Sequence, residues 1–304
     1  FSYMSKPFKK ALYVERNEQL CNIVTQNFKC LGLNNISTKN GNSIEVLHQL
    51  DSVSVLFLDP ARRNSSGGKV VSMADCEPNV LELCDEMVEK SHFVVLKLSP
   101  MLDWHSAVAQ LKYVTEVHIV SVGNECKELL LVLTDRNKTA KGYKSNTIQI
   151  FCVNDNDVFS YEEGIYSEGE KIPQQRIFDR NATLPPYLYE PNASIMKAGC
   201  FAQLSETYGV AALGHNSHLF VSPDFLPHFP GRKFQIVNVF TLNKKELRRA
   251  LAGMTQANIA VRNFPMRVDE LKKRLKLRDG GEHYIFATTR GDKEHILIIS
   301  KKEV

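Results

Sequence analysis

The residues with the clearest potential for chemistry lie at the end of an apolar run, in the sequence LFLDPARRN. Asp59 ends the run and Pro60 follows it, and Arg62 and Arg63 come directly before a loop rich in Ser and Gly. A carboxylate can orient a reacting group, and the fork of donors on a guanidinium fits a phosphate or a carboxylate. The same pattern also fits a plain strand end, in which Pro60 stops the strand and Asp59 caps a turn.

A lysine lies near the end of the next apolar run, in the sequence HFVVLKLSP. If the two runs are neighbouring strands, Lys97 comes close to Asp59, and its charge would be tuned there. Alternatively, the Lys97 stem lies along apolar surface and its amine reaches water. Both interpretations place a cation beside the end of the sheet.

Strands and helices alternate through the first 135 residues. Short strands are predicted at 11–15, 35–40, 53–59 and 92–98. The last two are apolar on both faces, which is typical of a parallel sheet covered by helices. Residues 116–133 predict two further strands around Gly123 and Asn124, a hairpin pattern. The predicted class is therefore α/β, with an antiparallel hairpin at the end of the sheet.

The second half of the chain predicts a smaller α+β domain. A helix is expected over ASIMKAGCFAQLSETYGV, which begins after Asn192. From 229 onward, the apolar pattern predicts the order strand, helix, strand, helix, strand, strand. Between the two halves lies a stretch rich in Pro, Asn and Asp, which is typical of a connection.

Composition narrows the class of protein. The 304 residues are 43% hydrophobic and 24% charged, as in ordinary globular proteins. No apolar run approaches the roughly 18 residues of a membrane-spanning helix. The seven cysteines form no CxxC pair and no zinc-binding pattern with histidine. We therefore expect a cytoplasmic protein with reduced thiols, no membrane segment and no metal site.

Several longer strings are specific enough to mark a family: YVERNEQL, LFLDPARRN, VVLKLSP, YEPNASIMKAG, NSHLF, FPGRKF, ANIAVRNFP, LKKRLKLRDGG and YIFATT. They resemble bacterial class I S-adenosylmethionine-dependent methyltransferases that continue into a ferredoxin-like segment and a THUMP-like domain. The resemblance implies a Rossmann-like methyltransferase domain, a linker, a ferredoxin-like segment and a THUMP-like domain, over 1–150, 151–186, 187–235 and 236–304. It also implies S-adenosylmethionine as cofactor and, because THUMP domains bind RNA, a tRNA or rRNA substrate.

Two residues at strand ends are candidates for holding the cofactor. Glu15 and Asn42 follow the first two strands of the chain, at the edge where open α/β sheets bind ligands. The resemblance implies that Glu15 accepts hydrogen bonds from a ribose, that Asn42 contacts adenine, and that Asp59 also lies against the cofactor. Alternatively, Glu15 caps the helix that begins near Asn17, and Asn42 is a turn residue beside Gly41.

The resemblance implies a catalytic role for Asp59 and Pro60, and Lys97 is a third catalytic candidate if it is a buried, charge-tuned group near Asp59. Methyltransferases that act on planar nitrogen place Asp or Asn before Pro-Pro and an aromatic residue, and those that make 5-methyluridine have Asp-Pro-Pro-Arg. This chain has Asp-Pro-Ala-Arg-Arg, so Ala61 departs from both patterns. The uridine enzymes also have a nucleophilic cysteine near the position of Lys97, which disfavours a covalent uracil mechanism here. The motif leaves the acceptor atom open.

Charge is distributed unevenly along the chain. Residues 244–278 hold eleven Lys or Arg, Arg262 among them, against three acids, whereas 151–170 hold six acids and no base. A basic face suits contacts with phosphates. The expected RNA contacts are Arg62, Arg63, Lys272, Lys273 and Arg274. Two alternatives remain: a non-catalytic RNA-binding protein on a degenerate methyltransferase scaffold, or a methyltransferase for a protein or small molecule whose basic face is merely solvated.

The sequence predicts one strand fewer than a class I methyltransferase sheet contains. Six strands are predicted over the first 135 residues, whereas that sheet normally has seven. The missing one would be the first, between those that end at Glu15 and Asp59, and its loop would bind the methionine end of the cofactor. Its absence would open a gap of about two strand spacings of ~4.8 Å. We therefore expect an N-terminal part that supplies this strand, and poor cofactor binding without it.

Overall fold

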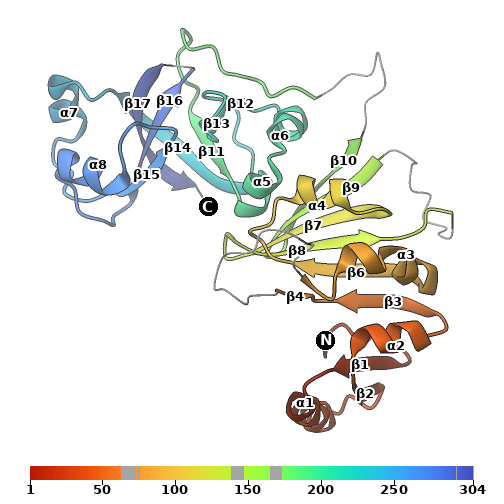
Figure 1. The fold of residues 1–304 in the computed structure, drawn as a ribbon. Coiled ribbons are helices and arrows are strands. Elements are labelled where there is room, and N and C mark those ends of the chain that lie inside the picture. The colour runs from red at the N-terminus through yellow and green to blue at the C-terminus, as the bar shows by residue number, and fades with distance from the viewer. Residues whose placement is uncertain (63–72, 74–75, 138–146, 165–172, 292, 304) are drawn as a thin grey trace. The chain divides into compact units, whose positions relative to one another are not determined.

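The computed structural model describes residues 1–62, 73, 76–137, 147–164, 173–291 and 293–303. The chain divides into two compact units, Phe1–Val117 with Leu129–Ser145, and His118–Glu128 with Asn146–Val304. Figure 1 shows the succession of helices and strands along the chain. No helix among the described residues is long and apolar enough to cross a membrane.

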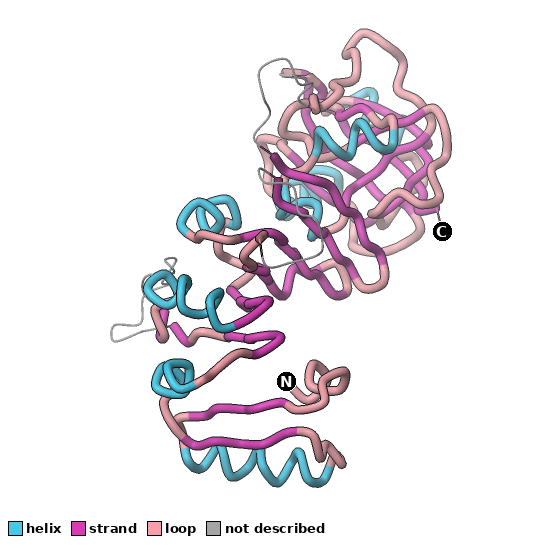
Figure 2. The backbone as a smooth tube through the Cα atoms, turned by 90° about the vertical axis from the view of Figure 1, so that its right-hand side faces the viewer, coloured by secondary structure: helices cyan, strands magenta, loops and turns pink. Residues whose placement is uncertain are grey.

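The chain begins with a small parallel pair of strands covered by a helix. Its elements are β1 (Ala11–Glu15), α1 (Glu18–Cys30), β2 (Ile36–Asn40) and α2 (Ser43–Gln49). β1 and β2 pair in parallel, and α1 lies along one side of the pair (Figure 2). Asn17 caps α1, and the helix buries Cys21 and Phe28. Phe28 meets Tyr13 of β1 edge to face, with ring centroids 5.7 Å apart, which fixes the helix on the strand.

The main sheet that follows has six strands in the order β10-β9-β7-β8-β6-β3. They are β3 (Val53–Leu58), β6 (Ser91–Leu98), β7 (Val114–Val122), β8 (Glu125–Leu133), β9 (Thr147–Asn154) and β10 (Asp157–Gly164). β3 and β6 are parallel, and β8 runs antiparallel to β6. The remaining elements here are β4 (Ala61–Arg62), β5 (Cys76–Glu77), α3 (Val80–Lys90) and α4 (Trp104–Gln110). The two strands predicted within 116–133 are confirmed as β7 and β8.

The sheet of the first unit is interrupted where the sequence predicts a missing strand. Among the described strands, β1 pairs only with β2 and β3 pairs only with β6. The expected break between the strands that end near Glu15 and Asp59 is therefore confirmed for the described residues. Which segment lies between them stays a prediction.

Residues 151–164 differ from the expected linker. They form most of the hairpin β9-β10, which extends the main sheet. Asp155 turns the hairpin with a φ of 52°. Along β10, Phe159 is buried while Val158 and Ser160 are exposed. Of the acids in this segment, Asp155 lies in the turn and Glu162 is exposed on β10, so an acidic composition here is compatible with a paired strand.

The second unit contains a seven-stranded sheet in the order β12-β13-β11-β14-β17-β16-β15. Its strands are β11 (Tyr187–Pro191), β12 (Ala211–Ala212), β13 (Phe220–Ser222), β14 (Gly231–Phe240), β15 (Asn258–Arg262), β16 (His283–Arg290) and β17 (Glu294–Glu303). Its helices are α5 (Ala193–Ala198), α6 (Phe201–Tyr208), α7 (Lys244–Ala250) and α8 (Val268–Leu275). The predicted order from β14 to β17 is confirmed. The single helix predicted after Asn192 is wrong, because Gly199 takes a left-handed φ of 72° and ends α5.

Alternate residues of the central strands pack on opposite faces of this sheet. Ile285 and Leu297 face a cluster that α7 and α8 cover, and Phe286 and Ile298 face a second cluster, to which β11 and β13 also contribute side chains. This alternation follows from the period of two residues in a strand. It places α7 and α8 in one layer on the same side of the sheet.

Candidate functional site

Asp59 and Lys97 meet at the carboxyl ends of two adjacent parallel strands. Leu58 of β3 pairs with Leu96 of β6, so the residues that follow them are neighbours. The Lys97 Nζ lies 3.0 Å from the Asp59 Oδ2, and the two side chains are 32% and 55% exposed. The prediction that Lys97 lies near Asp59 is confirmed. Their catalytic role, and that of Pro60, stays a prediction.

The segment after Asp59 folds back and is linked to the end of β1. Ala61 pairs with Glu77 across β4 and β5. The Arg16 Nη1 donates to the Glu77 Oε1 over 2.9 Å. This ion pair joins the carboxyl end of β1 to the segment that continues β3, on either side of the break in the sheet. The sequence analysis singled out neither partner. Arg16 could have been a candidate because it directly follows a predicted strand, whereas no feature of the sequence distinguishes Glu77 from other surface acids.

Glu15 makes local contacts that still leave room for a ligand. Its Oε1 accepts a hydrogen bond of 2.8 Å from the Asn17 N–H, while its Oε2 has, among the described residues, only the Tyr13 hydroxyl, at 3.5 Å. The N-cap of α1 is Asn17 itself. A half-buried carboxylate with one lightly used oxygen fits the paired hydroxyls of a ribose. The residue therefore fits the implied cofactor, and the cofactor role itself stays a prediction.

Asn42 has a clear structural role. Its Oδ1 accepts the Ile44 N–H over 2.9 Å and caps α2. The neighbouring Asn40 and Gly41 bond to the backbone carbonyl of Glu15, which ties the ends of β1 and β2 together. The side chain of Asn42 is exposed at the same edge as Glu15. The adenine contact implied for it stays a prediction.

The two groups of predicted RNA contacts differ in what the structure describes. Arg62 lies in β4, opposite Cys76, and Arg63 lies outside the described residues. Lys273 and Arg274 are exposed on α8, and the Lys272 Nζ lies 2.8 Å from the Asp279 Oδ2. α8 turns Leu271 and Leu275 to the core, so its cations point outward.

The cations of α7 and α8, all exposed except the half-buried Lys272, form what we call the basic helical layer. Its members are Lys244, Lys245, Arg248, Arg249, Lys272, Lys273 and Arg274. Both helices pack against the same cluster on one side of the sheet. The cations are therefore grouped in space, as contacts with a phosphate backbone require.

Arg262 does not belong to this layer, contrary to expectation. Its Nη2 lies 2.6 Å from the Glu190 Oε1, and Arg232 bonds to the other oxygen of the same carboxylate. The Glu190 side chain is only 4% exposed. A buried carboxylate needs such partners because desolvation would otherwise disfavour its charge. We call this arrangement the Glu190 bridge. It is a structural ion pair rather than an RNA contact.

Nothing in the described part of the chain indicates a metal site or an activated thiol. No group of three or more His, Cys, Asp or Glu side chains gathers there in a way that could hold a metal ion. Burial raises the pKa of Cys84 and Cys126. A neutral thiol is a poor nucleophile, so these cysteines do not suit covalent catalysis at neutral pH.

Comparisons with known proteins find two family models in the second half of the chain and one similar solved structure. Residues 187–230 match the family model of a ferredoxin-like domain, and residues 231–302 match that of a THUMP domain-like family. The chain is similar to the crystal structure of a "putative methyltransferase" from Porphyromonas gingivalis W83, with a TM-score of 0.83 and 26% identity over 100% of this chain and 80% of that one. No curated protein matches the chain. The chain therefore has a ferredoxin-like domain and a THUMP-like domain after an α/β region, in a fold that it shares along its whole length with that protein.

Proposed function

We propose that this protein is an S-adenosylmethionine-dependent methyltransferase that acts on RNA. The observation that carries the proposal is the Asp59–Lys97 pair at the carboxyl ends of β3 and β6. Open α/β sheets bind ligands at this edge. The similarity to a protein described as a methyltransferase supports the reaction class. The THUMP-like domain supports an RNA substrate.

The residues at this edge suit the demands of methyl transfer. When bound, S-adenosylmethionine would supply an activated methyl group, and its transfer depends more on positioning than on strong acid or base. Asp59 would accept a hydrogen bond from the acceptor and orient it. Lys97 would keep the Asp59 carboxylate in place through the contact of 3.0 Å, and Pro60 would shape the backbone there. Glu15 and Asn42 would hold the nucleoside part of the cofactor.

The basic helical layer would bind the RNA. Its exposed cations can release counterions from the RNA backbone, so affinity would fall as salt rises. Arg62 and Arg63, which follow Asp59, would contact the RNA close to the acceptor. Because cellular RNA is the substrate in this proposal, the protein would act in the cytoplasm.

A non-catalytic RNA-binding protein is the alternative, and one observation favours it. In the structure the Asp59 carboxylate is already engaged by Lys97. Ala61 also replaces the second proline that the amine-methylating and uridine-methylating patterns share. Such a protein would bind RNA without binding S-adenosylmethionine.

The test is transfer of tritium-labelled methyl groups from S-adenosylmethionine to total cellular RNA. Asp59→Ala removes the oxygens that would orient the acceptor, and we expect transfer to fall about 100-fold, as misplacement of a reacting group does. Asp51→Ala is the matched control, because Asp51 is an exposed acid in the same unit. Isothermal titration with S-adenosylmethionine separates the two functions. An absence of cofactor binding, with RNA binding intact, would rule out the enzyme.

A further inference from the structure

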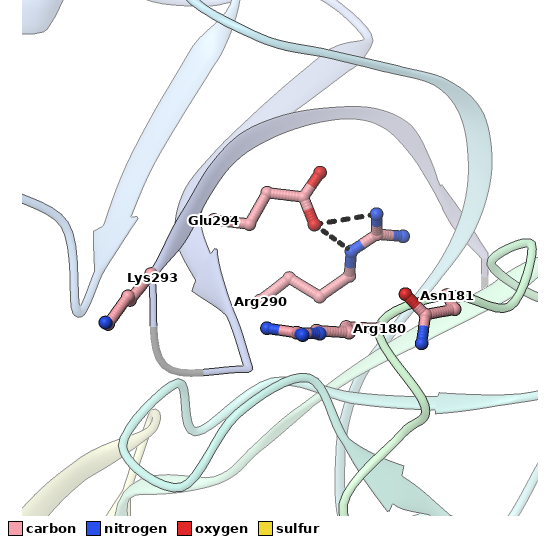
Figure 3. A pocket seen from close by; sticks show the side chains of 5 residues that line it. All are labelled: Arg180, Asn181, Arg290, Lys293 and Glu294. Carbon is pink, nitrogen blue, oxygen red and sulfur yellow. Dashed lines mark hydrogen bonds and ion pairs between the residues drawn. The ribbon is translucent and has the colours of Figure 1, made fainter.

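A cationic pocket lies in the second unit, whereas the predicted catalytic residues belong to the first. It has a volume of about 590 Å³ and is lined by Arg180, Asn181, Arg290, Lys293 and Glu294 (Figure 3). Two separate parts of the chain form it: the connection before β11, and the turn between β16 and β17. The proposed methyl transfer uses none of these residues.

Backbone hydrogen bonds fix both walls of the pocket to one short segment. Phe178 donates to the Ala212 carbonyl over 2.8 Å, and Ala212 donates to the Arg176 carbonyl over 2.7 Å. On the other wall, Gly291 donates to the Leu213 carbonyl over 2.7 Å. The backbone of both walls is therefore held by 212–213, which fixes where the side chains of the pocket begin before any ligand arrives.

A glycine makes this close approach possible. A Cβ added to Gly214 would lie 2.6 Å from the Gly291 carbonyl oxygen and 2.9 Å from that of Thr289. The Ser217 Oγ accepts from the Gly214 N–H at 3.1 Å and donates to the Gly214 carbonyl at 2.9 Å. The segment GHNSHLF thus holds the turn between β16 and β17 against the connection that carries Arg180. These contacts give a structural role to the motif NSHLF, for which the sequence alone indicated none.

The charges of the described residues that line the pocket do not cancel. The Glu294 Oε2 accepts from the Arg290 Nε at 2.8 Å and contacts its Nη2 at 2.7 Å. Arg180 and Lys293 have no ion-pair partner within the part of the chain that the structure describes. Among the described lining residues, three cations therefore face one carboxylate. Figure 3 shows Glu294 bonded to Arg290, with Arg180 on the other side of that side chain.

This chemistry selects a small, doubly charged oxyanion. All five lining side chains are polar, so an apolar ligand would gain little. Guanidinium groups match the oxygens of a phosphate, and the Asn181 amide can add a donor. A phosphate monoester carries about −1.5 to −2 near neutral pH, which balances the excess of two positive charges better than a diester does.

We propose that this pocket binds a terminal phosphate group of an RNA strand. The volume falls within the range of about 300–1,000 Å³ typical of ligand sites, so it holds a phosphate together with part of a nucleotide. That the phosphate belongs to RNA rests on the proposed function, whereas the phosphate site rests on the pocket alone. The exposed Arg180 side chain is the residue whose loss tests the pocket best, because it has no other described role.

Fluorescence anisotropy with one single-stranded RNA sequence, ending in phosphate or hydroxyl, tests the proposal. We expect the phosphorylated RNA to bind at least about 10-fold more tightly, as one charge-assisted hydrogen bond gives. Arg180→Gln should abolish this preference, while the hydroxyl RNA keeps its affinity. Arg176→Gln is the matched control, because Arg176 is exposed on the same connection but does not line the pocket.

Competition distinguishes the sources of the phosphate. If a nucleoside monophosphate or inorganic phosphate binds in an Arg180-dependent way as tightly as phosphorylated RNA, the site stands and the RNA assignment is overturned. If RNA with a terminal phosphate and RNA with a terminal hydroxyl bind the unchanged protein equally tightly, the pocket proposal is overturned. It is also overturned if Arg180→Gln and Arg176→Gln have the same effect on the preference for phosphorylated RNA. If no RNA binds at all, the proposed RNA function fails, and the titrations with nucleoside monophosphate and inorganic phosphate still decide whether the pocket binds phosphate.

Discussion

Removal of the charge at Glu190 should destabilise the second unit. Glu190 lies in β11, within the ferredoxin-like domain, whereas Arg232 and Arg262 lie in the THUMP-like domain. The Glu190 bridge therefore joins the two domains through one buried carboxylate. Glu190→Gln keeps the shape of the side chain and leaves both guanidinium groups facing a neutral amide.

The expected cost follows from the burial of the three groups. Breaking a fully buried ion pair by removing one partner costs about 3–5 kcal/mol. Here the carboxylate is 4% exposed, but the side chains of Arg232 and Arg262 are 36% and 37% exposed. Water can therefore solvate part of the uncompensated charge, and we expect the lower end of the range, about 3 kcal/mol.

Urea unfolding, followed by circular dichroism, measures this free energy. Asp279→Asn is the control, because it removes a carboxylate that is 69% exposed from its pair with Lys272 and should cost less than about 1 kcal/mol. The slope of the free energy with urea should be the same for both variants if the native fold is kept. If Glu190→Gln costs no more than Asp279→Asn, then the Glu190 bridge does not hold the two domains together.

Three further outcomes are expected. Gly214→Ala should lower the free energy of unfolding by at least about 1–3 kcal/mol in urea titrations, because its Cβ would meet backbone 2.6 Å away. Neutralising Lys272, Lys273 and Arg274 should reduce the slope of log affinity against log salt for single-stranded RNA by about 2, measured by anisotropy. Burial, and then a nearby arginine, lower the pKa of His218 from 6.5, so the unfolded chain binds a proton more readily. Stability should therefore fall as the pH drops below 6.5, and His218→Gln should reduce that fall in urea titrations at each pH.

The sequence predicts those features of the site that follow from the order of the strands. Two apolar runs predict neighbouring parallel strands, and parallel strands end at the same edge, so Asp59 and Lys97 could be placed together before any coordinates. The break in the sheet follows from the same reasoning, because the pattern lacks one strand. The spacing of apolar residues, every two residues in a strand and every 3.6 in a helix, is enough to predict the order of strands and helices.

The parts that the sequence could not predict depend on contacts between distant segments. Arg262 was counted as a surface cation because it falls within the basic stretch 244–278, yet its partner Glu190 lies on another strand. Strand β10 was assigned to a linker because its stretch is acidic, yet it pairs with β9. In these two cases tertiary packing overruled local composition. The end of α5 is different, because the left-handed Gly199 is a local signal that the sequence contains.

The two kinds of proposed phosphate contact place different demands on the fold. The basic helical layer needs only α7, α8 and the cluster beneath them, all within the THUMP-like domain. The cationic pocket needs Arg180 from the connection before β11, the backbone of 212–213 from the ferredoxin-like domain, and the turn between β16 and β17 from the THUMP-like domain. None of these three parts forms the pocket alone. General affinity for an RNA backbone can therefore arise from one domain, whereas selection of a phosphorylated end requires the packed assembly that the Glu190 bridge stabilises.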